Sequence, residues 1–320
     1  EVVFGDWSSD VCSSDLRGAY AAVRLGSTQA LRIGSSFPGM GDFSVDETVL
    51  EQELGITVDQ VSPSDLAGEV EAVSEAAVRE EMENDLRRFE ADVAAEVHAR
   101  SVRVGLAVRA ALARGDYSAF SVCFLDVGVG GGPFNVVPFL EASKAMSRGI
   151  GYAGEGDVLT AGLVGALAAA FGRTTFTEMF CPDWKGGAVF LSHMGEINPD
   201  VVAGKALLVE KEYRFSPALN PAIVTGAPAP GPAVLVNLAP GPGGSFGIIA
   251  APVDVLAEVA NASLRKAVRG WIKPRCGLPA FLETYSLNGG THHCALVMGD
   301  CLEGILAFAS CAELDAVVIR

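Results

Sequence analysis

The chain has 320 residues, half of them apolar, which suits a folded protein of more than one domain. Its 23 Lys and Arg residues against 39 Asp and Glu residues give a formal net charge of −16, which argues against nucleic acid or an anionic membrane as a partner. The seven cysteines include no CxxC pair, so they exclude a disulfide framework or zinc knuckle and indicate a reducing compartment, the cytoplasm.

The first segment differs from the rest of the chain. Residues 6–16, DWSSDVCSSDL, show no apolar periodicity and resemble translated sequencing-adaptor sequence. We therefore expect residues 1–16 to be a non-native addition. They are set aside in deriving the fold, as an expression tag would be.

Residues 17–173 are expected to fold as an α/β domain. Short apolar runs alternate with turn-rich stretches as far as residue 65, and residues 66–114 repeat apolar side chains at helical spacing among many charges. The next apolar run, AFSVCFLDVG (119–128), does not alternate with polar residues. That pattern is typical of a parallel strand buried on both faces.

Two further segments extend this domain. The stretch VVPFLEASKAMSRG (136–149) predicts a helix, and VLTAGLVGALAAAF (158–171) is apolar around its whole circumference. The second segment is shorter than the roughly 18 residues that a bilayer-spanning helix needs, so it predicts a helix in the protein core. The alternation of strands and helices favours a doubly wound α/β architecture.

Residues 174–320 have a different character. Proline and glycine become frequent, and short β-rich runs such as KALLVEKEY and AVLVNLA stand between turn signals. We expect an antiparallel, β-rich and barrel-like C-terminal domain here, with one helix over residues 253–269.

The turn GYAGEGD (151–157), at the entrance of the predicted core helix, carries two acids. Asp157 directly precedes that helix and is expected to cap its N-terminus. Glu155 lies between two glycines, and helix capping gives it no role. Because a helix N-terminus favours negative charge nearby, the sequence predicts an ionised carboxylate at this place.

Three other short stretches combine metal-type ligands with small residues: FTEMF with Glu178, LSHMGE with His193, and NGGTHH with His292 and His293. Each alone has an ordinary interpretation, because a loop Glu is usually solvated and a His in a strand is usually structural. Two neighbouring histidines in a strand point to opposite faces, so only one could face a given site. Together, two carboxylates and two imidazoles form a ligand set that suits Mn²⁺ or a similar divalent cation.

In this order, the motifs GYAGEGDVLTAGL, FTEMF, LSHMGEINP and NGGTHH resemble those of the L-arabinose and L-fucose isomerases, a group of metal-dependent ketol isomerases. The resemblance begins near Leu31 and covers the middle and C-terminal domains of that group, without its N-terminal domain. It implies a substrate contact at His292. The metal ligands that it implies are Glu155, Glu178, His193 and His293.

The resemblance also implies an enzyme that interconverts an aldose and a ketose through an ene-diolate, with Glu155 and Glu178 as the acid–base pair. Its implied cofactor is Mn²⁺, and its implied assembly is a homo-oligomer, a trimer or a hexamer. The segment FTEMFCPDWKGG departs from the arabinose isomerase pattern near the substrate pocket, so the identity of the small sugar stays open. Glu196 matches a further acid of the group, and we assign it no role.

Two other functions stay open on sequence grounds. The same Glu and His set could activate water in a metal-dependent hydrolase, or the chain could be a non-catalytic sugar-binding paralogue. Formation of a ketose from an aldose would distinguish the isomerase from the hydrolase. Sugar binding without a metal would favour the paralogue.

Overall fold

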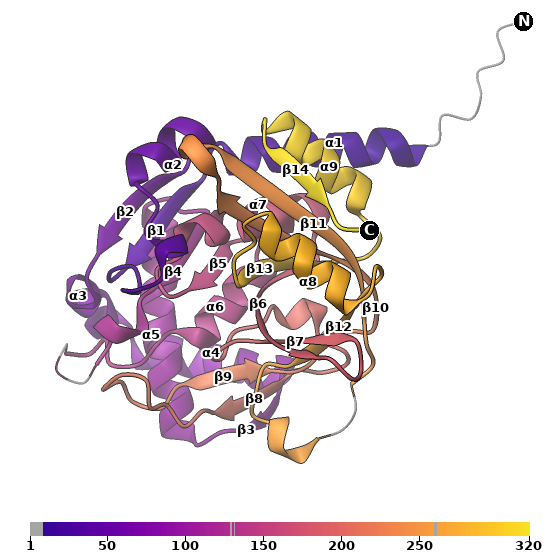
Figure 1. The fold of residues 1–320 in the computed structure, drawn as a ribbon. Coiled ribbons are helices and arrows are strands. Elements are labelled where there is room, and N and C mark those ends of the chain that lie inside the picture. The colour runs from indigo at the N-terminus through magenta and orange to yellow at the C-terminus, as the bar shows by residue number, and fades with distance from the viewer. Residues whose placement is uncertain (1–8, 129, 131, 259–260) are drawn as a thin grey trace, which may run out of the picture.

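A computed structural model describes residues 9–128, 130, 132–258 and 261–320, and Figure 1 shows how they are arranged. The first half of the chain is built on a parallel sheet with the strand order β2-β1-β4-β5. Because the chain adds β2 on one side of β1 and β4 on the other, a topological switch point lies between β1 and β4. The four strands are β1 (Gln29–Ile33), β2 (Thr57–Val61), β4 (Ala119–Val122) and β5 (Gly151–Gly154).

Helices alternate with these strands and cover the sheet (Figure 1), which confirms the doubly wound α/β architecture. Every residue of β4 and β5 is buried, as expected for strands of a parallel sheet that is covered on both faces. The α-helices described in this half are α1 (Ser9–Leu25), α2 (Glu47–Leu54), α3 (Ala67–Ala72), α4 (Glu75–Arg88), α5 (Ala95–Arg114), α6 (Phe139–Ser147) and α7 (Val158–Phe171).

Helix α7 is the predicted core helix, and it is buried from Val158 to Ala168. Helix α6 likewise confirms the helix expected over residues 136–149. The predicted helical stretch 66–114 is divided, because Ser74 caps a new helix by accepting a hydrogen bond from Ala77 N–H at 3.2 Å. A short strand, β3 (Glu90–Asp92), divides it again.

Helix α1 begins at Ser9, inside the segment set aside on sequence grounds, and residues 1–8 lie outside the described part of the chain. Its contact with the rest of the protein includes Gly18, where an added β-carbon would lie 2.5 Å from Ala307 Cβ of α9 (Leu302–Cys311). The α1 and α9 helices therefore pack at a backbone separation that only glycine permits at this position.

The second half of the chain forms a closed antiparallel β-barrel, which confirms the β-rich, barrel-like prediction. Its six strands follow one another in the order β10-β13-β6-β7-β12-β11, and β11 pairs with β10 to close the ring. A further strand, β14 (Asp315–Val318), adds to β11 in parallel. The barrel strands are β6 (Thr174–Asp183), β7 (Ala188–Ser192), β10 (Gly231–Pro240), β11 (Phe246–Val255), β12 (Gly270–Pro274) and β13 (His293–Met298).

The helix expected over residues 253–269 is wrong. Residues 253–255 complete β11, in which Val253 and Val255 are buried and Asp254 is exposed. This alternation has the period of a strand, and it continues a β-branched run that already belongs to the barrel. A short 3-10 turn, Ala262–Leu264, follows. The helices that the structure describes beside the barrel are α8 (Leu278–Leu287) and α9.

A third, small sheet joins the two halves. Strand β3 pairs in parallel with β8 (Leu207–Glu210), which pairs in turn with the antiparallel strand β9 (Ala222–Thr225). Figure 1 places this sheet at the end of the molecule opposite α1 and α9.

Helices α4, α5 and α6 are tied together by buried charges. The Lys144 ammonium donates to Glu81 Oε1 at 2.6 Å and to the two carboxylate oxygens of Asp85 at 2.9 and 3.1 Å. Nε2 of His98, on α5, lies 3.0 Å from Asp85 Oδ2. Because the Lys144 and Asp85 side chains are only 5% and 2% exposed, these two charges depend on one another rather than on water for stabilisation.

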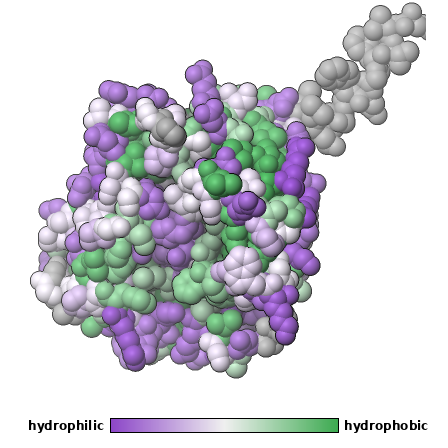
Figure 2. All heavy atoms as spheres, in the orientation of Figure 1, coloured by the Kyte–Doolittle hydropathy of each residue, from purple (hydrophilic) through white to green (hydrophobic). Residues whose placement is uncertain are grey.

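Hydrophilic and hydrophobic residues are interspersed on the face shown in Figure 2, as is usual for a folded protein with a filled core. Within the described residues, no helix combines the length and apolar character needed to cross a membrane.

Candidate metal centre

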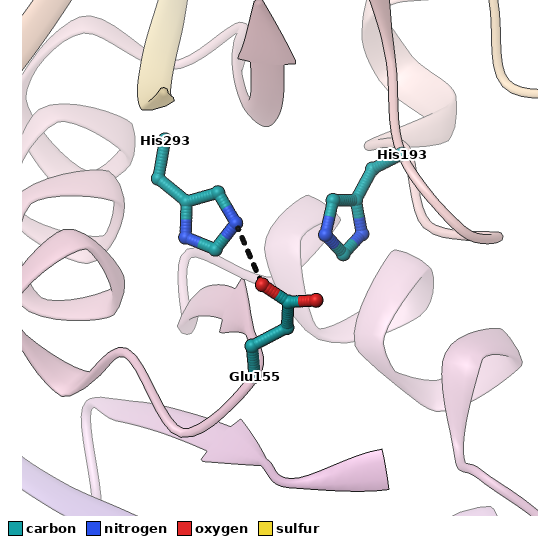
Figure 3. Close-up of side chains that lie close together, drawn as sticks. All are labelled: Glu155, His193 and His293. Carbon is teal, nitrogen blue, oxygen red and sulfur yellow. Dashed lines mark ion pairs between the residues drawn. The ribbon is translucent and has the colours of Figure 1, made fainter. Parts of the chain in front are cut away.

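Three of the predicted ligands meet where the parallel sheet adjoins the barrel. Glu155 follows β5, His193 follows β7, and His293 is the first residue of β13. One ligand atom of each residue lies within 4.8 Å of those of the other two. Figure 3 shows the two imidazole rings on either side of the Glu155 carboxylate. Three segments far apart in sequence therefore converge on one point.

The glycines around Glu155 are required by close packing. A β-carbon on Gly154 would lie 2.5 Å from His193 Cε1, and one on Gly156 would lie 2.3 Å from the Ser35 carbonyl oxygen. Glu155 itself has a left-handed backbone with φ of 67°, which non-glycine residues rarely adopt. The turn thus holds the Glu155 carboxylate against His193 at a place where a larger neighbour would not fit.

Asp157 has two roles, one of which the sequence predicted. Its Oδ1 accepts a hydrogen bond from Thr160 N–H at 2.9 Å, which makes it the N-cap of α7. Its Oδ2 lies 2.9 Å from His293 Nδ1, across 136 residues of sequence. Asp157 is therefore a capping residue and the partner that orients the His293 imidazole.

The two roles of Asp157 can be separated by mutation. Asn caps a helix as well as Asp does, so Asp157→Asn should keep the free energy of unfolding, whereas Asp157→Ala should lose about 1 kcal/mol. Both variants remove the charge at His293 Nδ1, and each should bind Mn²⁺ roughly 10–100-fold more weakly. Calorimetric titration and denaturant unfolding measure the two effects. Mn²⁺ affinity equal to that of the unmodified chain in both variants would contradict the orienting role.

His193 has a matching partner in Glu196, to which the sequence assigned no role. Nδ1 of His193 lies 2.8 Å from Glu196 Oε1, and Gly195 N–H donates to Glu196 Oε2 at 2.5 Å. The side chain of Glu196 is fully buried. A carboxylate at Nδ1 of each imidazole fixes the ring and leaves Nε2 as the ligand atom, an arrangement common to metal-binding histidines.

The state of His293 Nε2 tests whether this site suits a metal ion. The atom is buried and has no hydrogen-bond partner among the described residues, and it lies 3.7 Å from Glu155 Oε2. A buried polar nitrogen without a partner is costly in an ordinary protein interior. A divalent cation shared with Glu155 and His193 would satisfy it, so the residues present fit the metal.

The pKa values of the three residues follow from burial and from their partners. Burial raises the pKa of Glu155. Burial also lowers the pKa of His293 to about 4, although the hydrogen bond to Asp157 opposes this shift. Burial alone would lower the pKa of His193, but the Glu196 carboxylate outweighs it and raises the value to about 9. Near neutral pH and without a metal, His293 is therefore a neutral imidazole that can donate its lone pair, whereas His193 is protonated and must release a proton to bind a cation.

The close contact between Gly154 and His193 leads to a further prediction. In Gly154→Ala the new methyl group should displace the His193 ring, and Mn²⁺ affinity measured by calorimetry should fall by about 10–100-fold. Gly68→Ala is a matched control, because a β-carbon added at this position of helix α3 would meet nothing within 4 Å beyond its chain neighbours and the backbone of its own helix. Equal Mn²⁺ affinities of the two variants would refute the steric argument.

Glu178, the fourth predicted ligand, lies beside this group of three and is not one of its members. On β6 it pairs directly with His293 of β13 and with Ser192 of β7, and its side chain is half-buried. The negative charge of Glu178 contributes to the raised pKa values of Glu155 and His193. A β-bulge follows at Met179–Cys181, and bulges commonly redirect side chains next to active sites.

His292 differs from the sequence expectation in one respect. It precedes β13, so strand alternation does not separate its ring from that of His293, and the two ring centroids lie 4.5 Å apart. The expectation of opposite faces is therefore wrong. Nδ1 of His292 lies 3.2 Å from Asp42 Oδ2, and its side chain is 25% exposed, so it stands at the open side of the site.

Known proteins similar to this chain include bacterial L-arabinose isomerases. L-arabinose isomerase 1 of Bacillus licheniformis is 27% identical over 95% of this chain and 62% of its own length. L-arabinose isomerase of Saccharophagus degradans is 28% identical over 100% of this chain and 66% of its own length. The chain thus spans less than two thirds of each of these relatives.

Two family profiles match successive parts of the chain. The profile described as L-arabinose isomerase central domain matches residues 33–171, which contain the parallel sheet and Glu155. The profile described as L-arabinose isomerase C-terminal domain matches residues 173–315, which contain the barrel and the three site histidines, His193, His292 and His293. The chain belongs to the L-arabinose isomerase family and comprises its central and C-terminal domains.

Proposed function

We propose that this chain carries the active site of a metal-dependent isomerase that interconverts an aldose and a ketose of a small sugar. The observation that carries the proposal is the convergence of Glu155, His193 and His293, in which the buried Nε2 of His293 has no hydrogen-bond partner from the described part of the chain. Membership of the L-arabinose isomerase family supports this chemistry. Mixed carboxylate and imidazole donors suit Mn²⁺, which we propose as the cation.

The proposed metal ligands are Glu155, Glu178, His193 and His293. When bound there, a divalent cation would stabilise negative charge on the two oxygens of the reacting sugar carbons. Glu196 and Asp157 orient the two imidazoles. His292, at the open side of the site, would contact a sugar hydroxyl.

The proton transfer is assigned to Glu155 and Glu178. Isomerisation moves one proton between C1 and C2 through an ene-diolate while a second proton moves between the two oxygens. One group therefore takes the proton from one carbon and returns it to the other, and a second group carries the hydroxyl proton. Burial raises the pKa of Glu155, and a carboxyl with a raised pKa is the stronger base when ionised. Glu178, on strand β6 directly beside His293 of β13, would serve on the other side of the sugar.

The biological setting is proposed from the sequence and the resemblance. The six cysteines whose side chains the structure describes are free, which fits a reducing, cytoplasmic environment. We further propose that residues 17–173 and 174–320 form two domains. We also propose that the chain assembles as a homo-oligomer, a trimer or a hexamer.

The proposal is tested by incubating the chain, loaded with Mn²⁺, with a panel of aldopentoses and aldohexoses and measuring ketose formation. Formation of a ketose that stops after chelation of the metal is the expected result. Ester or amide hydrolysis without ketose formation would replace the isomerase with a hydrolase. Sugar binding by a chain that binds no metal would instead indicate a non-catalytic protein.

A further inference from the structure

The segment between β1 and α2, residues 34–46, lies across the metal centre, and we call it the strap. Its Phe37 N–H donates to the Glu155 carbonyl at 2.9 Å, directly at the proposed ligand. Farther along, Phe43 lies in a single 3-10 turn, Gly41–Phe43, beside the two adjacent histidines. The strap therefore contacts the α/β side and the barrel side of the same site.

Both ends of the strap are fixed. At its start, Asp126 Oδ2 accepts hydrogen bonds from Ser35 N–H at 2.6 Å and from the Ser35 hydroxyl at 2.8 Å. Just beyond its end, Glu47, the first residue of α2, forms an ion pair with Arg32 of β1 at 2.5 Å. The same Arg32 donates through Nε to the Gly156 carbonyl at 3.3 Å. The strap and the turn that holds Glu155 are thus held by one buried guanidinium group.

Phe43 packs against the imidazoles from the strap side. Its ring is 3% exposed, although neighbouring strap residues are largely exposed. It stacks on His293 with a centroid distance of 4.6 Å and an interplanar angle of 25°, and its centroid lies 5.2 Å from that of His292. Such a ring excludes water from one face of His293 and restricts the rotation of both imidazoles.

Asp42, the residue before Phe43, gives His292 the kind of partner that the other two site histidines have. His193 has Glu196 at Nδ1, His293 has Asp157 at Nδ1, and Nδ1 of His292 lies 3.2 Å from Asp42 Oδ2. An imidazole whose Nδ1 proton faces a carboxylate presents Nε2 as a hydrogen-bond acceptor. A sugar hydroxyl is the donor that matches such an acceptor.

We propose that Asp42 and Phe43 are positioning residues for the sugar: Asp42 holds His292 with Nε2 ready to accept from a polyol hydroxyl, and Phe43 fixes the rotation of the ring pair. This inference rests on the proposed function, because it takes a sugar as the ligand of the site. It assigns the strap to substrate binding, separately from the residues that bind the metal.

The experiment uses L-arabitol, a polyol that cannot isomerise, as the binding probe for the Mn²⁺-loaded chain. Calorimetry should give weaker L-arabitol binding by about 10-fold or more for Asp42→Ala, with unchanged Mn²⁺ affinity. Asp42→Asn keeps an acceptor for the Nδ1 proton and should recover most of the affinity. Asp46→Asn is the matched control, because Asp46 caps α2 at the strap end and Asn preserves that cap.

A second measurement reads the His292 tautomer without any sugar. The chain contains four histidines, so hydrogen–nitrogen correlation spectra of the histidine-labelled protein are simple. The Nδ1-protonated form of His292 should dominate in the unmodified chain and in Asp42→Asn, and should lose its dominance in Asp42→Ala. Phe43→Leu should leave that tautomer in place while weakening L-arabitol binding.

The outcomes separate this inference from the proposed function. If the unmodified chain binds Mn²⁺ but binds no L-arabitol and forms no ketose from any aldose of the panel, the sugar function fails and with it the sugar part of the inference, and the tautomer still decides whether Asp42 holds His292. If Asp42→Ala binds L-arabitol as tightly as the unmodified chain, the positioning role is overturned while the proposed function stands. An unchanged His292 tautomer in Asp42→Ala overturns it equally.

Discussion

Replacing Glu155 with glutamine is expected to reduce ketose formation by two to four orders of magnitude, roughly the contribution of a positioned acid–base group. Gln has nearly the shape of Glu but carries no charge, so it should also weaken Mn²⁺ binding. Ketose formation under saturating Mn²⁺ and calorimetric Mn²⁺ titration measure the two losses. Glu212→Gln is the matched control, because the Glu212 side chain is 68% exposed and pairs with Arg214 on the surface.

The same substitution should not destabilise the metal-free fold. Burial raises the pKa of Glu155, so the folded state favours its protonated form. That stabilisation is complete below the ordinary pKa of a glutamate and is lost as the pH rises through the raised value. At neutral pH the ionised carboxylate opposes folding, and neutral Gln should leave the thermal midpoint equal or higher. A lower midpoint together with full activity would refute both the catalytic and the electrostatic assignment.

Replacing Asp85 with alanine is expected to lower the free energy of unfolding by about 3–5 kcal/mol, the usual cost of breaking a buried ion pair. Without the Asp85 carboxylate, the buried Lys144 ammonium keeps Glu81 as its carboxylate partner in this cluster, and His98 Nε2 loses the oxygen it contacts. Denaturant unfolding measures the change. The effect should be on stability and not on Mn²⁺ affinity, because this cluster lies among α4, α5 and α6.

Asp92→Ala is the control for Asp85→Ala. Asp92 pairs with Arg265 at 2.6 Å, but both side chains are more than half exposed, so water already solvates the two charges. The variant should unfold at the same denaturant concentration as the unmodified chain. If the two variants were equally stable, burial would not be the source of the Asp85 contribution.

Local patterns were sufficient to predict the elements that hold Glu155. The uninterrupted apolar runs of β4 and α7 indicate burial on all sides, and both elements are buried. The position of Asp157 before α7 predicted its cap, since capping acts over three residues. By contrast, the strand period at the end of β11 covers only residues 253–255, too few to distinguish a strand from a helix, and the proline- and glycine-rich sequence nearby gives no clear signal for either.

Partners brought together only by the fold could not be predicted in this way. The contact of Asp157 with His293 spans 136 residues, and that of Asp42 with His292 joins the strap to the barrel. Nothing in the local sequence of either acid points to an imidazole. Glu196 is different, because it lies three residues after His193, and such close spacing in a turn was a usable signal for their contact.

The division of the candidate ligands between two units of structure, the parallel sheet and the barrel, has a consequence for recombination. The parallel sheet contributes Glu155, and the barrel contributes His193 and His293. A chimera that takes each unit from a different relative would inherit an incomplete coordination sphere from either parent alone. The cation affinity of such a hybrid would therefore measure how closely its parallel sheet and its barrel pack in the native arrangement. This measurement needs no sugar.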